Sequence, residues 1–272
     1  MLKLIASDMD GTLLNDQKEI FPYMAAVVQA LNEKGIRFVV ASGRQLESLT
    51  CYFDSVSVPM TYIAENGGLA YEDKTCVYAR SLMPRDVKLI THLTRSLPGA
   101  YVIYGTADGS FVEGAHTQDD WDYLSRFYAR LSPVDDILSL LEKKEICKVT
   151  VCDRRGAEQQ AWPLLEEKLA LRLKVTLSGQ DWVDVSGQNV NKGEALRFLQ
   201  KRYGVKPEEC AAIGDYLNDV ELLQSCGQSY AMKNAHPQLF SSAAQITKED
   251  NNHFGACRTI CQLAGIPLPG KR

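Results

Sequence analysis

An apolar run near the start of the chain ends on two aspartates, and this feature constrains the fold more than any other. Residues 2–6 are mainly apolar and predict a buried strand, Asp8 and Asp10 follow at once, and Gly11 and Thr12 turn the backbone. Ligands of open α/β sheets bind outside the carboxyl ends of the strands. A buried charge without a partner of opposite charge is costly. Two neighbouring aspartates at a buried strand end therefore indicate a cation-binding site or a catalytic site. The alternative is an acidic surface turn, because Asp and Gly are common in turns.

Strands and helices alternate on both sides of this feature, which predicts right-handed βαβ units and a doubly wound parallel sheet. The alternation stops near residue 84 and resumes after residue 185. A hairpin is expected at residues 69–71 and 76–79. Strands are expected at residues 2–6, 36–41, 60–64, 210–213 and 229–232, and helices at residues 22–34, 45–53, 192–203, 220–225 and 256–263.

The middle of the chain has a different pattern, with short aromatic strands and fewer parallel units. Its length of roughly a hundred residues is that of a common domain. We therefore predict a core domain formed by residues 1–83 and 186–272, interrupted by an inserted α+β domain at residues 84–185. Helices are expected there at residues 86–96, 121–131 and 158–169, and strands at 101–104, 110–112, 146–152, 173–178 and 182–185.

Composition narrows the classes of partner and the compartment. With 45% hydrophobic and 24% charged residues, the 272-residue chain can bury an ordinary core. A formal net charge of -4 without a long basic run argues against a nucleic-acid partner. No apolar run approaches the ~20 residues that span a bilayer, and no signal peptide is visible. Eight scattered cysteines without a Cys-x-x-Cys motif predict free thiols and a cytoplasmic protein. The oligomeric state is not predicted.

Polar side chains directly follow several of the expected strands. A further polar residue, Lys192, stands at the start of an expected helix. The carboxyl ends of strands in one sheet face one crevice, so these groups can meet although they are far apart in sequence. We expect one site comprising Asp8, Asp10, Ser42, Lys192, Asp215, Asn218 and Asp219.

The chemistry of these residue types is mutually consistent. Asp8 and Asp215, with a backbone carbonyl, would form a hard oxygen site suited to Mg²⁺. Ser42 and the Gly43 amide can donate hydrogen bonds to phosphate oxygens. Lys192, at the start of a helix, adds an ammonium group to backbone amides that favour an anion. The pattern therefore predicts a metal-assisted phosphate site.

A reaction follows from the paired acids. One carboxylate can attack phosphorus as a nucleophile, while Asp10 protonates the leaving oxygen and later deprotonates the attacking water. Taken singly, each residue has an ordinary alternative role. Ser42 could cap the next helix, Lys192 could be a solvated helix residue, and Asp215 and Asp219 could neutralise a helix N-terminus.

The ordered set of motifs resembles the haloacid dehalogenase superfamily, in particular its Cof-type phosphatases with a large α/β cap. The resemblance spans nearly the whole chain, with a cap-sized insertion between the second and third motifs. The chain departs from the family pattern at Asn189, Lys233 and the loop 251–255, which the proposed chemistry does not use. The motifs are Asp8-Met9-Asp10-Gly11-Thr12, Ser42-Gly43-Arg44, Lys192-Gly193 and Gly214-Asp215-x-x-Asn218-Asp219, with lesser signatures at Glu65-Asn66-Gly67 and Met232-x-Asn234-Ala235.

This resemblance implies a Rossmann-like core and a Mg²⁺-dependent phosphatase that acts on small phosphorylated metabolites, either sugar phosphates or phosphorylated cofactors. It implies an aspartyl-phosphate intermediate and a substrate-selecting cap. The alternatives are a phosphomutase on hexose phosphates and a non-catalytic sensor of phosphorylated ligands. The implied roles are Asp8 as nucleophile and metal ligand, Asp10 as acid/base and carbonyl ligand of the metal, Asp215 and Asp219 at the metal, and Ser42, Gly43, Lys192 and Asn218 at the phosphate.

Overall fold

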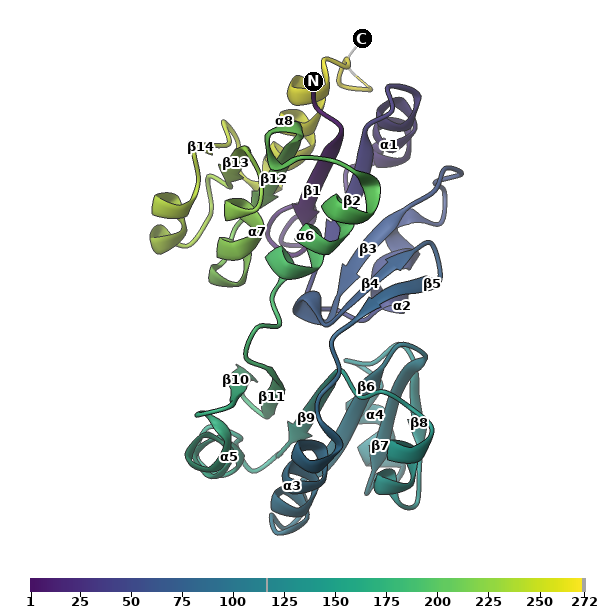
Figure 1. Ribbon diagram of the computed structural model, residues 1–272, viewed down its shortest axis with the longest axis vertical. Helices are drawn as coiled ribbons and strands as arrows, with labels where there is room; N and C mark the ends of the chain where they lie inside the picture. Colours follow the sequence, from purple (N-terminus) through teal and green to yellow (C-terminus); the bar gives the residue numbers. More distant parts are fainter. Residues whose placement is uncertain (116, 271–272) are drawn as a thin grey trace. The chain divides into compact units, whose positions relative to one another are not determined.

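The computed structural model describes residues 1–115 and 117–270, and the chain divides into two compact units. Unit 1 joins Met1–Tyr78 to Asn191–Arg272, and unit 2 is Ala79–Val190. The predicted insertion at residues 84–185 lies within unit 2. Figure 1 shows the two units in the colours of the sequence, with unit 1 in purple, blue, green and yellow and unit 2 mainly in teal.

Unit 1 contains an eight-stranded sheet in the order β14-β13-β12-β1-β2-β3-β4-β5. The first six strands of this order are mutually parallel, and β4 runs antiparallel to β3. The first strand of the chain lies at the centre, since Leu4 pairs with Arg37 on one side and Cys210 on the other. The strands are β1 (Leu4–Asp8), β2 (Arg37–Ala41), β3 (Thr61–Ala64), β4 (Leu69–Glu72), β5 (Thr75–Ala79), β12 (Cys210–Gly214), β13 (Gln228–Ala231) and β14 (Gln245–Ile246).

Helices cover both faces of this sheet, α1 packing with α8 and α6 with α7 (Figure 1). In α1, Met24, Val27, Val28 and Leu31 are buried, at the spacing of one helix face. The α-helices are α1 (Met24–Glu33), α2 (Leu46–Thr50), α6 (Lys192–Tyr203), α7 (Val220–Gln224) and α8 (Gly255–Ala264), and the 3₁₀-helices are Cys51–Phe53, Glu65–Gly67, Pro207–Glu209, Leu217–Asp219, Pro237–Ser242 and Asn251–His253. The predicted α/β doubly wound fold is confirmed.

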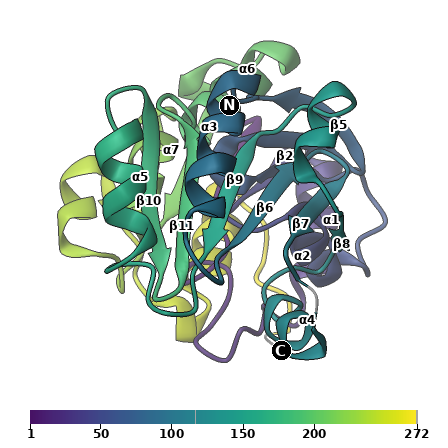
Figure 2. The ribbon, with the colours of Figure 1, turned by 90° about the horizontal axis from the view of Figure 1, so that it is seen from below.

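Unit 2 contains a six-stranded sheet in the order β10-β11-β9-β6-β7-β8, antiparallel except between β7 and β8. Helices α3 and α5 cross the same face of this sheet (Figure 2). The elements are α3 (Pro84–Arg95), β6 (Tyr101–Thr106), β7 (Gly109–Glu113), α4 (Gln118–Leu124), β8 (Leu131–Pro133), a 3₁₀-helix (Ile137–Glu142), β9 (Lys148–Cys152), α5 (Ala161–Leu169), β10 (Leu173–Gly179) and β11 (Trp182–Gly187).

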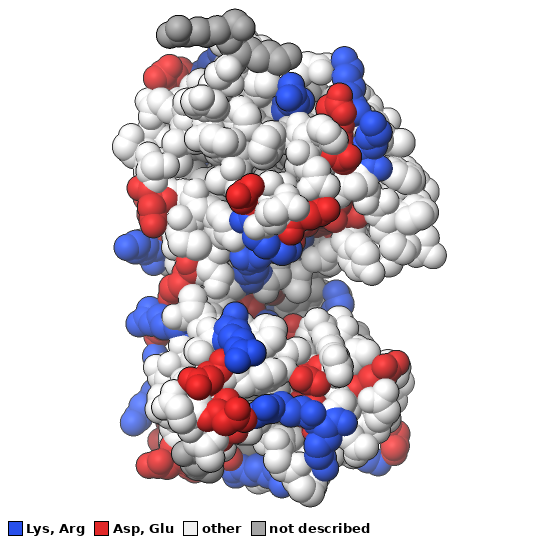
Figure 3. Space-filling model, turned by 180° about the vertical axis from the view of Figure 1, so that it is seen from behind, with Lys and Arg blue, Asp and Glu red and all other residues white. Residues whose placement is uncertain are grey.

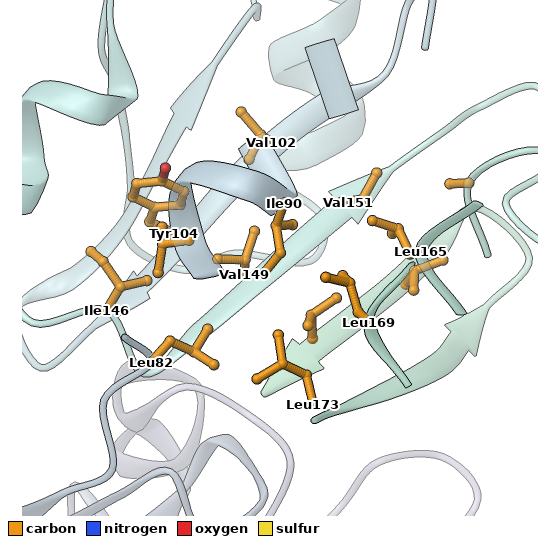
Figure 4. Close-up of a cluster of buried hydrophobic side chains, with 14 of the residues drawn as sticks. Leu82, Ile90, Val102, Tyr104, Ile146, Val149, Val151, Leu165, Leu169 and Leu173 are labelled. Carbon is orange, nitrogen blue, oxygen red and sulfur yellow. The ribbon is translucent and has the colours of Figure 1, made fainter. Parts of the chain in front are cut away.

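The core of unit 2 lies between these two helices and the sheet. Ile90 of α3 and Leu165 and Leu169 of α5 pack with Val149 and Val151 of β9, and all five side chains are fully buried (Figure 4). Successive strand residues point to opposite faces of a sheet. Thr150, which stands between Val149 and Val151 in β9, therefore lies on the other face. Unit 2 therefore has a hydrophobic core of its own.

The predicted helix over residues 121–131 is wrong. Helix α4 ends at Leu124, and Leu131 begins β8, which pairs with β7. The error arises because Trp121, Leu124, Tyr128 and Leu131 recur at helical spacing. In the fold all four belong to one hydrophobic cluster, but Tyr128 reaches it from the loop after α4 and Leu131 from a strand. Tertiary packing therefore satisfies the same periodicity without a helix.

The surface carries charges of both signs. On the face shown in Figure 3, Lys and Arg side chains alternate with Asp and Glu over both units. Within the described part of the chain, the helices are too short or too polar to cross a membrane.

Candidate active site

Asp8 is the last residue of β1, at the carboxyl end of the central strand of unit 1 (Figure 1). Its side chain is buried, although the backbone leaves the sheet directly after it. Gly11 makes this exit with φ +74°, in the left-handed region that Gly adopts at no steric cost. The carboxylate of Asp8 is thus fixed at the centre of the edge where α/β sheets bind ligands.

Lys192 lies fully buried between two carboxylates. Its Nζ is 2.5 Å from Asp8 Oδ1 and 2.6 Å from Asp219 Oδ1. Burial lowers the pKa of this lysine, but the charges of Asp219 and Asp8 outweigh burial and raise the pKa above its ordinary value. Asn191 positions the residue, because its side chain caps helix α6 by accepting a hydrogen bond from Glu194 N at 2.8 Å. Lys192 is therefore a buried, doubly paired cation rather than a solvated helix residue.

Three carboxylates form a group that fits a divalent cation. One oxygen from each of Asp8, Asp215 and Asp219 lies within 4.8 Å of the others. Burial, followed by the charge of Asp219, raises the pKa of Asp8 well above its ordinary value and that of Asp215 to about 6. Lys192 supplies one positive charge to three acids. A hard divalent cation suits such oxygen ligands and the remaining negative charge.

Asp219 is engaged by the protein at both carboxylate oxygens. Oδ1 accepts from Lys192, and Oδ2 accepts from the backbone N–H groups of Asp215 at 3.0 Å and Tyr216 at 3.2 Å. The carboxylate of Asp215 is in turn held by Thr12, whose Oγ1 donates to Oδ1 at 2.9 Å. Asp219 therefore fixes the shape of the loop after β12, and Asp215 has the more accessible carboxylate of the two.

The side chain of Asp10 faces different partners from those of Asp8. Arg44 donates two hydrogen bonds to it, from Nε at 2.7 Å and from the terminal nitrogen at 2.6 Å, and Lys18 Nζ lies 2.8 Å from Oδ1. Burial raises the pKa of Asp10, but the hydrogen bonds from Arg44 and Lys18 outweigh burial and lower it overall. Asp10 is thus held as a carboxylate in this conformation.

The predicted phosphate-binding residues form contacts around Asn66. Asn218 Nδ2 donates to Asn66 Oδ1 at 2.9 Å, and a Cβ on Gly43 would lie 2.9 Å from the Asn66 amide nitrogen. Ser42 is buried, and its Oγ accepts from Arg44 N at 3.2 Å. Ser42 is not the N-cap residue of α2, which is Gln45. The absence of a side chain at Gly43 therefore lets the amide of Asn66 lie close to the loop after β2.

Sequence reasoning did not assign roles to four residues that hold this site together. Arg44 and Thr12 follow the same strand ends as the predicted residues, so the strand-end rule contained the signal for them. Asn66 lies in a recognised signature, and its left-handed backbone (φ 54°) brings its amide to Gly43. Lys18 lies in a loop, and no sequence pattern marks it as a partner of Asp10.

We expect Gly11→Ala to destabilise unit 1 by about 1–3 kcal/mol, the range for a strained left-handed residue. A Cβ at Gly11 would also lie 2.3 Å from Asp215 Oδ2. Urea unfolding in EDTA measures the effect. Gly35→Ala is the matched control, since Gly35 has φ +70° but no atom of the described residues lies within 4 Å of its Cβ position. Equal losses in the two variants would show that the contact with Asp215 adds nothing.

Comparison with known proteins agrees with this geometry. A family model described as haloacid dehalogenase-like hydrolase matches residues 5–258. The chain is 29% identical over 98% of its length to 5-amino-6-(5-phospho-D-ribitylamino)uracil phosphatase YbjI of Escherichia coli (strain K12), covering 98% of that protein. It is 25% identical over 96% of its length to the phosphatase of the same description, YwtE, from Bacillus subtilis (strain 168), covering 98% of that protein.

A solved structure shares the fold over nearly the full length. A crystal structure from Eubacterium rectale has a TM-score of 0.87 and 29% identity, covering 96% of this chain and 99% of that one. The family model covers most of the chain, and the relatives named above are phosphatases. The chain therefore belongs to the haloacid dehalogenase-like hydrolases, as a phosphatase of the Cof type.

Proposed function

We propose that this protein is a Mg²⁺-dependent phosphatase of small phosphorylated metabolites that acts through an aspartyl-phosphate on Asp8. The observation that carries the proposal is the group of buried Asp8, Lys192 and Asp219 with partly buried Asp215 at the carboxyl edge of the sheet. It joins a nucleophile, a fixed cation and additional hard oxygen ligands. A phosphate-binding role alone would not require so many carboxylates.

Asp8 and Asp215, with the backbone carbonyl of Asp10, are the proposed ligands of Mg²⁺. The carboxylate oxygens of Asp219 already accept hydrogen bonds from Lys192 and two backbone amides. We therefore propose that Asp219 positions Lys192 and the loop of Asp215, and that it would contact the cation through water. When bound, the cation would offset the repulsion between a carboxylate nucleophile and the phosphoryl oxygens. The positive charge of Lys192, which lies against Asp8, would reduce the same repulsion.

In the first proposed step, a carboxylate oxygen of Asp8 forms a bond to phosphorus while the bond to the ester oxygen breaks, and Asp10 gives that oxygen its proton. In the second step, Asp10 takes a proton from water, the water oxygen bonds to phosphorus, and phosphate leaves Asp8. Asn218, Ser42, the Gly43 amide and Lys192 are the proposed partners of the phosphate oxygens.

Asp10 must separate from Arg44 and Lys18 before it can act as an acid, because both donors favour its ionised form. We expect Asp10→Asn to slow formation and breakdown of the phosphoenzyme by about 10²–10⁴-fold each, the scale of general acid–base catalysis. Rapid quench of both half-reactions measures this. Asp16→Asn, an exposed aspartate in the following loop, is the control. Normal rates for Asp10→Asn would leave Asp10 with a structural role only.

The proposed substrate is a small phosphate ester, and unit 2 is the proposed cap that selects its leaving group. The acids and the lysine proposed for chemistry lie in unit 1, while unit 2 is a continuous segment with its own core. The relatives named for 5-amino-6-(5-phospho-D-ribitylamino)uracil make that compound a candidate substrate. Cytoplasmic residence is proposed because the eight cysteines are free thiols.

Phosphate release from a panel of phosphorylated metabolites, with Mg²⁺ and with excess EDTA, tests the proposal. We expect phosphate release with Mg²⁺ only. Borohydride added during turnover should reduce the acyl phosphate, release its phosphate and convert Asp8 to homoserine, which peptide mass spectrometry detects. Interconversion of hexose phosphates without phosphate release would indicate a phosphomutase instead. Binding of esters without turnover of any of them would indicate a sensor.

A further inference from the structure

Tyr216 is a large aromatic side chain exposed directly beside the acid cluster. It follows Asp215 in the loop after β12 and precedes Asn218 by two residues, and 57% of its surface is exposed. Its neighbour Leu217 is 38% exposed. Neither side chain contributes to the core of unit 1, so the fold does not require an aromatic and an aliphatic residue there. Exposed apolar side chains that adjoin one another commonly mark a ligand-binding or interaction surface.

The ring of Tyr216 is held in place rather than free in solvent. Its backbone N–H donates to Asp219 Oδ2 at 3.2 Å. The ring packs edge-to-face with His236 at 5.4 Å between centroids and an interplanar angle of 77°. The backbone N–H of His236 donates to Asp215 O at 2.8 Å. The backbones that carry the two rings are therefore tied to Asp215 and Asp219, and the rings support each other by packing edge-to-face.

We propose that Tyr216, supported by His236, is a specificity-determining residue that contacts a planar unsaturated ring in the leaving group of the substrate. This inference rests on the proposed phosphatase function. A phosphoryl group at Asp8 would direct its leaving group towards solvent, and Tyr216 is an exposed ring in the loop that carries Asp215 and Asp219. A pre-positioned aromatic ring offers contact area at little cost in conformational entropy. Aromatic contacts favour offset or edge-to-face packing with another ring, which a sugar lacks.

A pair of esters with the same phosphate position isolates the contribution of the ring. Uridine 5′-monophosphate and ribose 5-phosphate both carry the phosphate on the C5 oxygen of ribose, and the first adds a uracil ring. An aromatic contact changes affinity by about two- to tenfold. We expect Tyr216→Ala to lower kcat/KM for uridine 5′-monophosphate by about that factor, mainly through KM, and to change the value for ribose 5-phosphate less than twofold.

Two further variants separate the ring from the fold. Tyr216→Phe keeps the ring and should keep the preference for uridine 5′-monophosphate. Tyr23→Ala removes another exposed tyrosine of unit 1, which is 50% exposed and packs against Phe21. It should leave both esters unaffected. An equal loss for both esters in Tyr216→Ala, or an undiminished preference, would overturn the proposal.

A binding measurement distinguishes failure of this inference from failure of the proposed function. Calorimetric titration of the two esters, with Mg²⁺, into Asp8→Asn and into the double variant Asp8→Asn/Tyr216→Ala does not depend on turnover. Tighter binding of uridine 5′-monophosphate that disappears in the double variant supports the ring contact even if no ester is hydrolysed. Equal affinities in the two proteins overturn it even if the wild-type protein is an active phosphatase.

Discussion

Asp8→Asn should lower turnover by at least about 10⁴-fold, the scale of losing a covalent nucleophile, and should leave the fold intact. An amide cannot form the proposed phosphoenzyme. It can still accept a hydrogen bond from Lys192 Nζ, which lies 2.5 Å from the carboxylate in the wild-type protein. Because burial and the nearby charge of Asp219 raise the pKa of Asp8, a neutral side chain is tolerated at this position.

Steady-state phosphate release and circular dichroism of the same preparation measure the two parts of this prediction. Asp54→Asn, at an exposed aspartate of unit 1, controls for the loss of a negative charge and should retain full activity. Turnover of Asp8→Asn within tenfold of wild type would exclude Asp8 as the nucleophile. Loss of activity accompanied by unfolding would leave the nucleophile unassigned and require the trapping experiment to identify it.

Asp215→Asn should abolish metal-dependent activity and yet stabilise the metal-free protein. Burial and the charge of Asp219 raise the folded-state pKa of Asp215 to about 6, against an ordinary value of 3.8. The ionised group therefore destabilises the folded state above pH 6, and this cost disappears as the pH falls towards 3.8. We expect the variant to be about 1–3 kcal/mol more stable than wild type in EDTA at pH 7.5, with the difference shrinking towards pH 4.

Adding Mg²⁺ should reverse the order of stability. A cation at one hundred times its dissociation constant stabilises a binding protein by about 2.7 kcal/mol, and the variant should gain little. Urea unfolding at pH 7.5 and pH 4, with EDTA and with Mg²⁺, measures all four conditions. If wild type and variant respond equally to Mg²⁺, Asp215 is not a ligand of the cation. Full wild-type activity in excess EDTA would contradict metal dependence altogether.

The strand ends could be predicted from sequence because hydrophobic runs and the polar residues after them are local patterns. Asp8, Ser42 and Asp215 were all located in this way, and β12 then brings Asp215 beside Asp8 by parallel pairing. The burial of Lys192 could not be predicted, since a lysine is buried only where tertiary contacts supply opposite charges. Lys18 was missed for the same reason, because its partner Asp10 is reached through the shape of a loop.

The helix wrongly expected at residues 121–131 has a related cause. Side-chain periodicity indicates which residues reach the core, and a loop followed by a strand can place Tyr128 and Leu131 there as well as a helix can. The burial of polar residues is harder to predict from the sequence than the burial of apolar ones. Asp120 is buried in unit 2 because it accepts from Tyr101 and from the backbone of Thr117, and both contacts depend on the finished fold.

The central position of β1 has a consequence for synthesis of the protein. Its partner strand β12 begins at Cys210, so the ribosome makes about two hundred further residues before that pairing is available. At about 5–20 residues per second, the delay is on the order of 10–40 s. Unit 2 is complete by Val190 and can fold in that interval, whereas β1 has an open edge and Asp8 has neither Lys192 nor Asp219 beside it. The nascent chain therefore exposes the β12-facing edge of β1 until the second half of unit 1 has been made.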